Sequence, residues 1–164
     1  MTRREFEVKD PALIREILDK SKVLHLGLVD EGMPYVVPMS YGYRMKEGRL
    51  TIYLHSAVKG YKLDVIAKNP TCCFEMEYGV EPFVGKIPCQ YGITYYSLMG
   101  RGKAVMVEDV AEKEQAMTLL MKTQTGKNFE FNERLVSIVS VLRIDVSEYT
   151  AKHRPLPGQE PSQK

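Results

Sequence analysis

The chain has 164 residues, of which 44% are hydrophobic and 27% are charged. This composition is typical of a folded globular domain and excludes a wholly disordered or fibrous chain. The 23 basic and 21 acidic residues leave a formal charge of +2, which is too small to favour nucleic-acid binding through the phosphate backbone. A single domain with one core is expected for this length.

The sequence has no run that approaches the roughly 20 apolar residues of a membrane span. Residues 1–10 are charged and lack the apolar core of a signal peptide. We therefore expect a cytoplasmic protein without a membrane partner.

Cysteine and histidine residues are few and irregularly spaced. The cysteines are Cys72, Cys73 and Cys89, and the histidines are His25, His55 and His153. An odd number of cysteines, two of them adjacent, argues against a disulfide framework. No Cys-x-x-Cys or His-x-x-x-His spacing occurs, so no metal site is expected.

The first half of the chain predicts a helix and three strands. Asp10 and Pro11 form an N-cap and a favoured first helical residue, and apolar residues follow at helical spacing. Apolar, β-branched and aromatic runs separated by turn signals predict strands at 23–29, 35–43 and 50–55. Antiparallel hairpins are therefore expected.

The middle of the chain predicts a helix, a strand and a long loop. Residues 59–69 have one apolar helical face and end at Asn69-Pro70, where proline disfavours further helix. Residues 71–77 read as a strand, whereas 79–88 is rich in Gly and Pro and is expected to be a functional loop.

The last third predicts two strands around a helix. Residues 93–108 are long enough for a bent strand, with Gly100 and Gly102 at its kink or bulge. Residues 110–122 have helical periodicity, and 135–149 reads as the closing strand. The stretch 151–164 is rich in proline and is expected to be a disordered tail.

This order of elements favours a mainly β domain over residues 1–150. Six or seven antiparallel strands with three helices can close into a barrel, which removes exposed strand edges.

The first candidate for chemistry is the strand-to-helix junction at 53–62. A helix start, the Ser56 hydroxyl and the ammonium groups of Lys59 and Lys62 together are able to bind a phosphate. The alternative is that Ser56 only caps the helix and that both lysines are solvated.

Two further segments are candidates for contact with a planar ring. In the first, Pro38 interrupts a strand, which leaves backbone groups near Met39 and Ser40 free to meet the edge of a ring. The alternative is an edge strand without a ligand. In the second, Tyr95 and Tyr96 either stack on a ring or bury a face of the barrel.

These segments occur in an order that resembles a known family. Val37-Pro38-Met39-Ser40-Tyr41-Gly42, then Tyr53-Leu54-His55-Ser56-Ala57 with Gly60 and Lys62, and then the run from Ser97 to Ala104 are similar to the FMN-binding split β-barrel of the pyridoxamine-phosphate-oxidase-like superfamily. Three shorter motifs are most similar to the nitroimidazole-resistance flavoproteins of this superfamily. They are Leu-Gly-Leu-Val-Asp at 26–30, His-Ser-Ala at 55–57 and Gly-x-Gly-Lys-Ala at 100–104. The resemblance covers about residues 1–150.

The resemblance implies an FMN cofactor at the interface of a homodimer. Ser56 matches the family's hydroxyl near the FMN phosphate, Lys62 matches its phosphate-binding lysine, and residues 37–41 match the strand that meets the isoalloxazine ring. The implied cofactor-binding residues are Val37, Pro38, Met39, Ser40, Tyr41, His55, Ser56, Ala57, Lys59, Gly60, Lys62 and Ser97.

Two positions depart from the oxidases proper. Ser97 stands where they usually have a glutamine, and Tyr61 stands where they usually have a phosphate-binding arginine. Lys59 is able to supply the missing charge. The departures argue against a true pyridoxamine-phosphate oxidase.

The implied function is an FMN-dependent oxidoreductase that reduces nitroaromatic or other small oxidised compounds. His55 is the candidate proton donor or anion ligand, and its alternative role is a strand-end histidine bonded to backbone. The loop 79–88 is expected to cap the flavin. The rival functions are a flavin or haem carrier without turnover and an interaction protein with an empty barrel.

Overall fold

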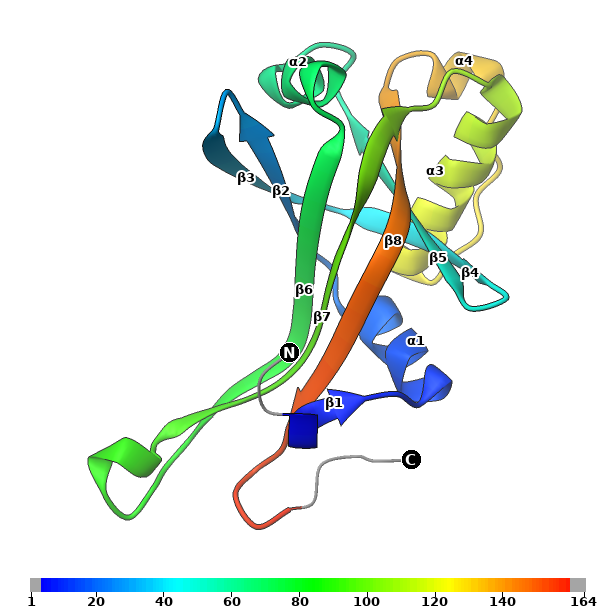
Figure 1. The fold of residues 1–164 in the computed structure, drawn as a ribbon. Helices are drawn as coiled ribbons and strands as arrows, with labels where there is room; N and C mark the ends of the chain where they lie inside the picture. The colour runs from blue at the N-terminus through cyan, green and yellow to red at the C-terminus, as the bar shows by residue number, and fades with distance from the viewer. Residues whose placement is uncertain (1–3, 160–164) are drawn as a thin grey trace.

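The computed structural model describes residues 4–159. Its helices and strands follow one another in the order shown in Figure 1. The helical segments are η1 (Arg4–Phe6), α1 (Pro11–Lys20), α2 (Tyr61–Lys68), η2 (Pro88–Gln90), α3 (Val110–Thr125) and α4 (Glu133–Val136). The strands are β1 (Glu7–Val8), β2 (Leu24–Asp30), β3 (Met33–Met39), β4 (Tyr41–Lys46), β5 (Arg49–Ser56), β6 (Thr71–Phe83), β7 (Gly92–Met106) and β8 (Ser140–Arg154).

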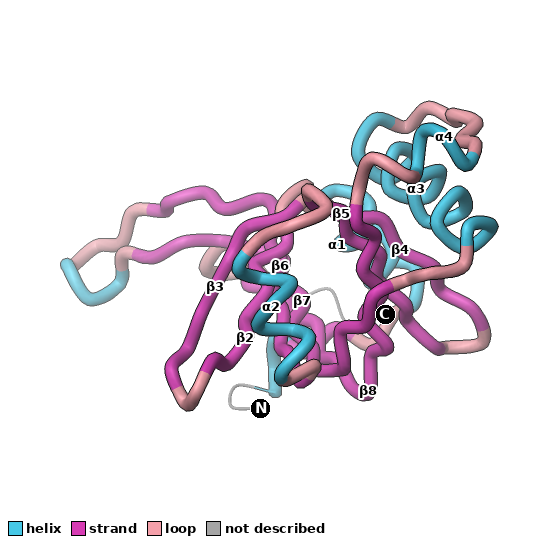
Figure 2. The backbone as a smooth tube through the Cα atoms, turned by 90° about the horizontal axis from the view of Figure 1, so that it is seen from above, coloured by secondary structure: helices cyan, strands magenta, loops and turns pink. Residues whose placement is uncertain are grey.

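The strands form one antiparallel sheet in the order β3-β2-β6-β7-β8-β5-β4, with β1 paired to β8. The strands at the two edges, β3 and β4, are consecutive in the chain and are separated only by Ser40. The sheet therefore curls until its edges meet through the covalent chain rather than through a hydrogen-bonded ladder (Figures 1 and 2). This is a split barrel, as the sequence predicts.

The interior is filled by alternate side chains of the strands, as the period of two requires. Leu26, Phe74, Leu98 and Leu142 are at most 2% exposed and belong to one cluster with apolar residues of α1 and α2. Burial of this apolar surface is the main source of stability for the barrel.

Helices α3 and α4 cover the outside of the barrel, with α3 beside β4 and β5 (Figure 1). A second apolar cluster lies under them and includes Tyr53, Met117 and Val136. Gly42 on β4 permits the close approach, because a Cβ there would lie 2.3 Å from the backbone nitrogen of Leu120.

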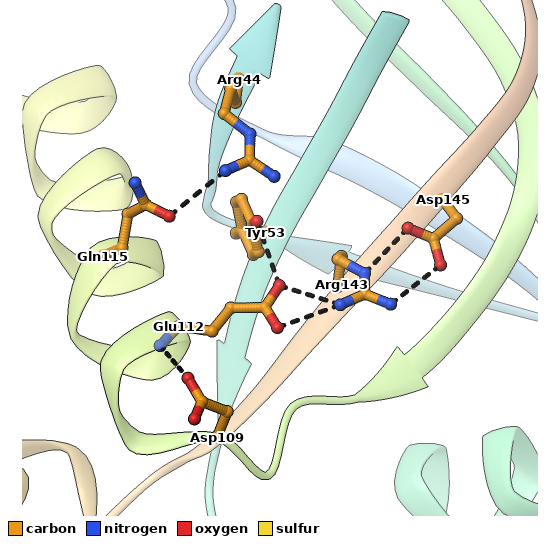
Figure 3. A network of polar contacts seen from close by, with 7 residues as sticks. All are labelled: Arg44, Tyr53, Asp109, Glu112, Gln115, Arg143 and Asp145. Atoms are coloured by element: carbon orange, nitrogen blue, oxygen red, sulfur yellow. Dashed lines mark hydrogen bonds and ion pairs between the residues drawn. The ribbon is translucent and has the colours of Figure 1, made fainter.

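A polar network also attaches α3 to the sheet (Figure 3). The Arg143 guanidinium donates to both carboxylate oxygens of Glu112 at 2.9 and 3.0 Å, and to Asp145 at 2.8 and 3.2 Å. The Tyr53 hydroxyl donates to the same Glu112 carboxylate at 3.2 Å. The first turn of α3 is thereby bonded to neighbouring strands β5 and β8.

Several sequence-based boundaries are confirmed. Asp10 caps α1 by accepting from the backbone nitrogens of Ala12 and Leu13. The pairing of β7 with β8 shifts between Arg101 and Gly102, which is where a bulge is expected. A Cβ on Gly102 would lie 2.3 Å from the Asp145 carbonyl oxygen, so only glycine fits without movement.

The expected strand at 35–43 and the expected loop at 79–88 are both wrong as predicted. The first is two strands that break at Ser40. In the second, β6 continues to Phe83 through a register shift between Tyr78 and Glu81. Pro82 is tolerated because this part of the hairpin is a two-stranded arm with free edges. The arm, residues 79–93, projects away from the barrel (Figures 1 and 2).

The end of the chain also differs from the prediction. Residues 135–139 do not begin the last strand, because Asn132 caps α4 by accepting from the Leu135 nitrogen. Strand β8 continues to Arg154, with Ala151 only 2% exposed, so the domain does not end at 150. Pairing with β1 and β7 compensates for the polar composition there. The expectation of disorder at 160–164 lies outside the described residues.

The additional short elements β1 and α4, and the break at Ser40, explain why residues 4–159 contain eight strands and four α-helices instead of six or seven strands and three helices. None of the helices in this range combines the length and hydrophobicity that a membrane span requires.

Candidate functional site

The junction between β5 and α2 has the features of an anion site. The N-cap of α2 is Gly60, with φ 156° and ψ 153°, and it provides no side-chain hydrogen bond to the helix. This region of backbone space is open essentially only to glycine. Ser56 instead donates its hydroxyl to the Ala57 carbonyl at 2.9 Å, so its alternative role as the helix cap is wrong. The first turn of α2 is free of a side-chain cap and favours a negative charge.

The basic residues at this junction are His55, Lys59 and Lys62, and the first turn of α2 also contains one acidic residue, Asp64. Lys59 is exposed and Lys62 is half-buried. Burial, and in smaller part the nearby charge of Lys62, lower the pKa of His55. His55 is therefore held towards its neutral form.

His55 also carries an unsatisfied polar atom. Its Nδ1 is buried and has no hydrogen-bond partner among residues 4–159. Buried polar atoms are nearly always paired, and an exception needs an explanation. A bound ligand at this junction would supply the missing partner, so the residues present fit a phosphate group.

The break at Ser40 lies beside this junction. Tyr41, the first residue of β4, pairs with Leu54, which directly precedes His55 on β5. The structure therefore brings together two of the three segments that the sequence singles out. Strand β3 is an edge strand, which explains why Pro38 is tolerated, and one side of β3 has no pairing strand among residues 4–159.

Tyr41 itself is held by hydrogen bonds that stabilise the fold. Its hydroxyl donates to the Leu18 carbonyl at 2.8 Å, and its own carbonyl accepts from Gln124 at 2.8 Å. Its side chain is fully buried. Of the ring-facing backbone expected at 37–41, the groups of Met39 and Ser40 are the better candidates.

Ser97 does not lie at the same site within one chain. It pairs with Lys152 on β8, whereas Ser56 pairs with Ser140 on the same strand. Residues 140 and 152 are separated by roughly 40 Å of extended strand. The fold thus places this position far from the β5–α2 junction.

Packing decides between the two interpretations of Tyr96 in the third segment. Tyr96 stacks between the Tyr78 ring, at 4.6 Å between centroids, and the His153 ring, at 3.9 Å. The core-packing interpretation of Tyr96 is therefore confirmed. His153 lies 57 positions further along the chain than Tyr96, so this stacking leaves no local signal in the sequence.

Tyr61 has a role that the sequence does not predict. Its hydroxyl donates a hydrogen bond to the Asp30 carboxylate, which raises the pKa of Tyr61. Its ring meets the Tyr35 ring edge-on at 5.1 Å. Tyr61 thus ties α2 to the β2–β3 hairpin and does not replace the charge of arginine.

The arm lies at the far end of the barrel from α2 (Figure 1). Phe83, expected in a flavin cap, is 8% exposed and lies under the Arg154 guanidinium at 5.2 Å. Val84 is 78% exposed. In its own chain the arm is therefore remote from the β5–α2 junction.

Comparison with known proteins supports the split-barrel assignment. A family model described as pyridoxamine 5'-phosphate oxidase matches residues 10–153. The chain belongs to this family. A search of curated proteins gives no match.

Solved structures of similar fold include three informative ones. A provisionally assigned 5-nitroimidazole antibiotic resistance protein from Bacteroides thetaiotaomicron is 31% identical, with a TM-score of 0.75, over 90% of this chain and 86% of the other. A flavocytochrome from Azotobacter vinelandii is 17% identical, with a TM-score of 0.76, over 96% and 73%. A FAD and heme binding protein from Mycobacterium smegmatis is 14% identical, with a TM-score of 0.76, over 98% and 77%. The latter two likenesses concern the fold alone.

Proposed function

We propose that the protein binds FMN with the phosphate at the β5–α2 junction. The observation that carries the proposal is the start of α2, which has no side-chain cap and lies beside Lys62 and the unpartnered Nδ1 of His55. A phosphate there would receive backbone N–H groups, a hydroxyl and a lysine charge.

Each residue of the junction has a separate part in this proposal. Gly60 lets the backbone approach the phosphate, because no Cβ stands in the way. Ser56 would rotate its hydroxyl from the Ala57 carbonyl to the ligand, and Lys62 with Lys59 would balance its charge. Met39 and Ser40 would offer backbone groups to the edge of the ring. Ala57 and Val37 would contribute contact surface.

When bound, FMN supplies the electron-transfer chemistry, and the chain's own residues bind and orient it. His55, kept neutral at neutral pH, can accept or donate one hydrogen bond at Nδ1, depending on its tautomer. It would orient the phosphate end or a small substrate beside it. This role stays secondary to binding.

We further propose that the functional unit is a homodimer. Ser97 and the arm are both remote from the junction of their own chain, so a second copy would have to bring them to it. The arm also presents exposed apolar side chains, which favour burial against a partner. These are Val80, Val84, Ile87, Tyr91 and Ile93. Light scattering after size exclusion tests this, and a monomer at every concentration would contradict it.

The reaction that we propose is reduction of nitroaromatic or other small oxidised compounds. It is supported by the 31% identical structure, which is assigned to 5-nitroimidazole resistance. The alternative is a flavin or haem carrier, favoured by the lack of any carboxylic acid among the proposed contacts. Turnover of a nitroimidazole with a reduced nicotinamide donor separates the two, because a carrier would show none above free FMN.

Binding is tested by FMN titration of site variants. Lys62→Ala and Ser56→Ala are each expected to weaken binding by about 1–3 kcal/mol, which is roughly 5–150-fold in Kd. Lys68→Ala is the matched control, because it removes the same charge from the opposite end of α2, where Lys68 pairs with Asp30. Unchanged affinity in both site variants would move the phosphate elsewhere.

A further inference from the structure

Three chemically suited side chains meet on the outer face of the barrel, away from the β5–α2 junction. His25 on β2 pairs directly with Glu75 on β6. Glu77 lies two residues further along β6, so all three side chains point to the same face. Their arrangement follows from strand register and not from a flexible loop.

The distances between their ligand atoms suit a bound ion. His25 Nδ1 lies 3.4 Å from a Glu75 carboxylate oxygen and 3.8 Å from a Glu77 carboxylate oxygen. One ligand atom from each of the three residues lies within 4.8 Å of the others. Ligands bonded at about 2.1 Å around a tetrahedral ion are about 3.4 Å apart.

The two distances from His25 are long for direct hydrogen bonds to the carboxylates. A charge-assisted N–H···O hydrogen bond measures about 2.7–2.9 Å, and both histidine contacts exceed that. The two carboxylates also repel one another on adjacent same-face positions. A cation between the three groups would offset this repulsion and bond to all of them.

Two residues of the cluster, His25 and Glu75, line a groove on this face. The groove has a volume of about 680 Å³ and is also lined by Met99, Arg101 and Lys152. The three side chains are between 33% and 41% exposed. Three protein ligands with an open side leave one coordination position for water or a small anion, as in catalytic rather than structural zinc sites.

We propose that His25, Glu75 and Glu77 bind one divalent transition-metal ion, and zinc is the ion used to test this. Imidazole nitrogen with carboxylate oxygen is a ligand set that zinc accepts. None of the three ligands belongs to the β5–α2 junction, although Glu77 pairs with Ser97 across β6 and β7, so zinc binding is measured on protein without FMN.

The test is calorimetric titration of tag-free protein with zinc chloride. The expected result is one zinc per chain, with affinity reduced by about tenfold or more in both His25→Ala and Glu77→Gln. Glu77→Gln preserves side-chain size and guards against misfolding, which thermal melts followed by circular dichroism would reveal. Glu148→Gln is the control, because this glutamate lines the same groove but is not a proposed ligand.

Cys73 requires its own control, because this exposed thiol lines the groove as well. Cys73→Ser is expected to keep its zinc affinity within about twofold, since a thiol outside the ligand set contributes no bond. Loss of zinc in Cys73→Ser would overturn the assignment. So would the absence of one-to-one binding, or an unchanged affinity in the folded Glu77→Gln variant.

Discussion

Replacing Glu112 by alanine is expected to destabilise the fold by about 2–4 kcal/mol. Its carboxylate accepts two hydrogen bonds from Arg143 and one from Tyr53 (Figure 3). Hydrogen bonds to charged groups contribute about 1.5–3 kcal/mol. The lower part of that range applies to the contact between Arg143 and Glu112, because their side chains are 31% and 25% exposed. In the variant Arg143 also retains its hydrogen bonds to Asp145.

The loss of the Tyr53 contact adds to this cost. Tyr53 is 1% exposed, so its hydroxyl would lose a buried acceptor at about 1 kcal/mol. An acidic side chain in the first turn of α3 adds about 0.5 kcal/mol through the helix dipole. Tyr53→Phe alone is expected to cost about 1 kcal/mol, and its coupling to Glu112→Ala to be of similar size.

The assay is urea unfolding at neutral pH for the wild type, both single variants and the double variant. Glu114→Ala is the matched control, because it removes the same charge from a nearby position on α3. This variant should cost less than about 0.5 kcal/mol. A Glu112→Ala loss no larger than that of the control, or a coupling energy of zero, would refute the network as a source of stability.

Three other variants probe the fold and the site. Gly42→Ala should destabilise by about 1–3 kcal/mol in urea unfolding, because the new Cβ meets the Leu120 backbone; equal stability would contradict the close approach. Asp109→Ala should cost about 1 kcal/mol in the same assay, because it removes the cap of α3; no loss would mean that the cap is dispensable. The pKa of His55 is lowered on folding, so the unfolded chain binds its proton more readily and stability falls as pH drops below about 6.5. His55→Gln should therefore lose less stability than the wild type between pH 7 and 5, and an equal loss would contradict the shift.

Local signals were sufficient for much of the fold. The cap at Asp10 and the bulge at Gly102 each depend on neighbouring residues, and the structure confirms both predictions. These positions need only local chemistry, such as a short acceptor at a helix start or a residue without a Cβ.

Composition misled where tertiary pairing decided the outcome. Residues 151–154 and 79–83 are polar or rich in Gly and Pro, yet both extend strands because an adjacent strand was available. Helix α4, which Asn132 caps, has only four residues. A helix this short shows no periodicity in the sequence, so the sequence pattern does not predict it.

The candidate site was predictable only in part. The closeness of Ser40 to His55 follows from the pairing of β4 with β5, which a hairpin pattern suggests. The separation of Ser97 depends on the register of a fifteen-residue strand, and sequence patterns do not fix register over that length. The His25 cluster joins residues 50 positions apart, so ligand-spacing rules could not reveal it.

The most direct test of FMN binding at the β5–α2 junction is a crystal structure of the protein grown with excess FMN. The expected density places the phosphate at the first turn of α2, within hydrogen-bond distance of Lys62 and Ser56. A flavin bound elsewhere with this junction empty, or a protein that takes up no flavin at all, would contradict the proposal.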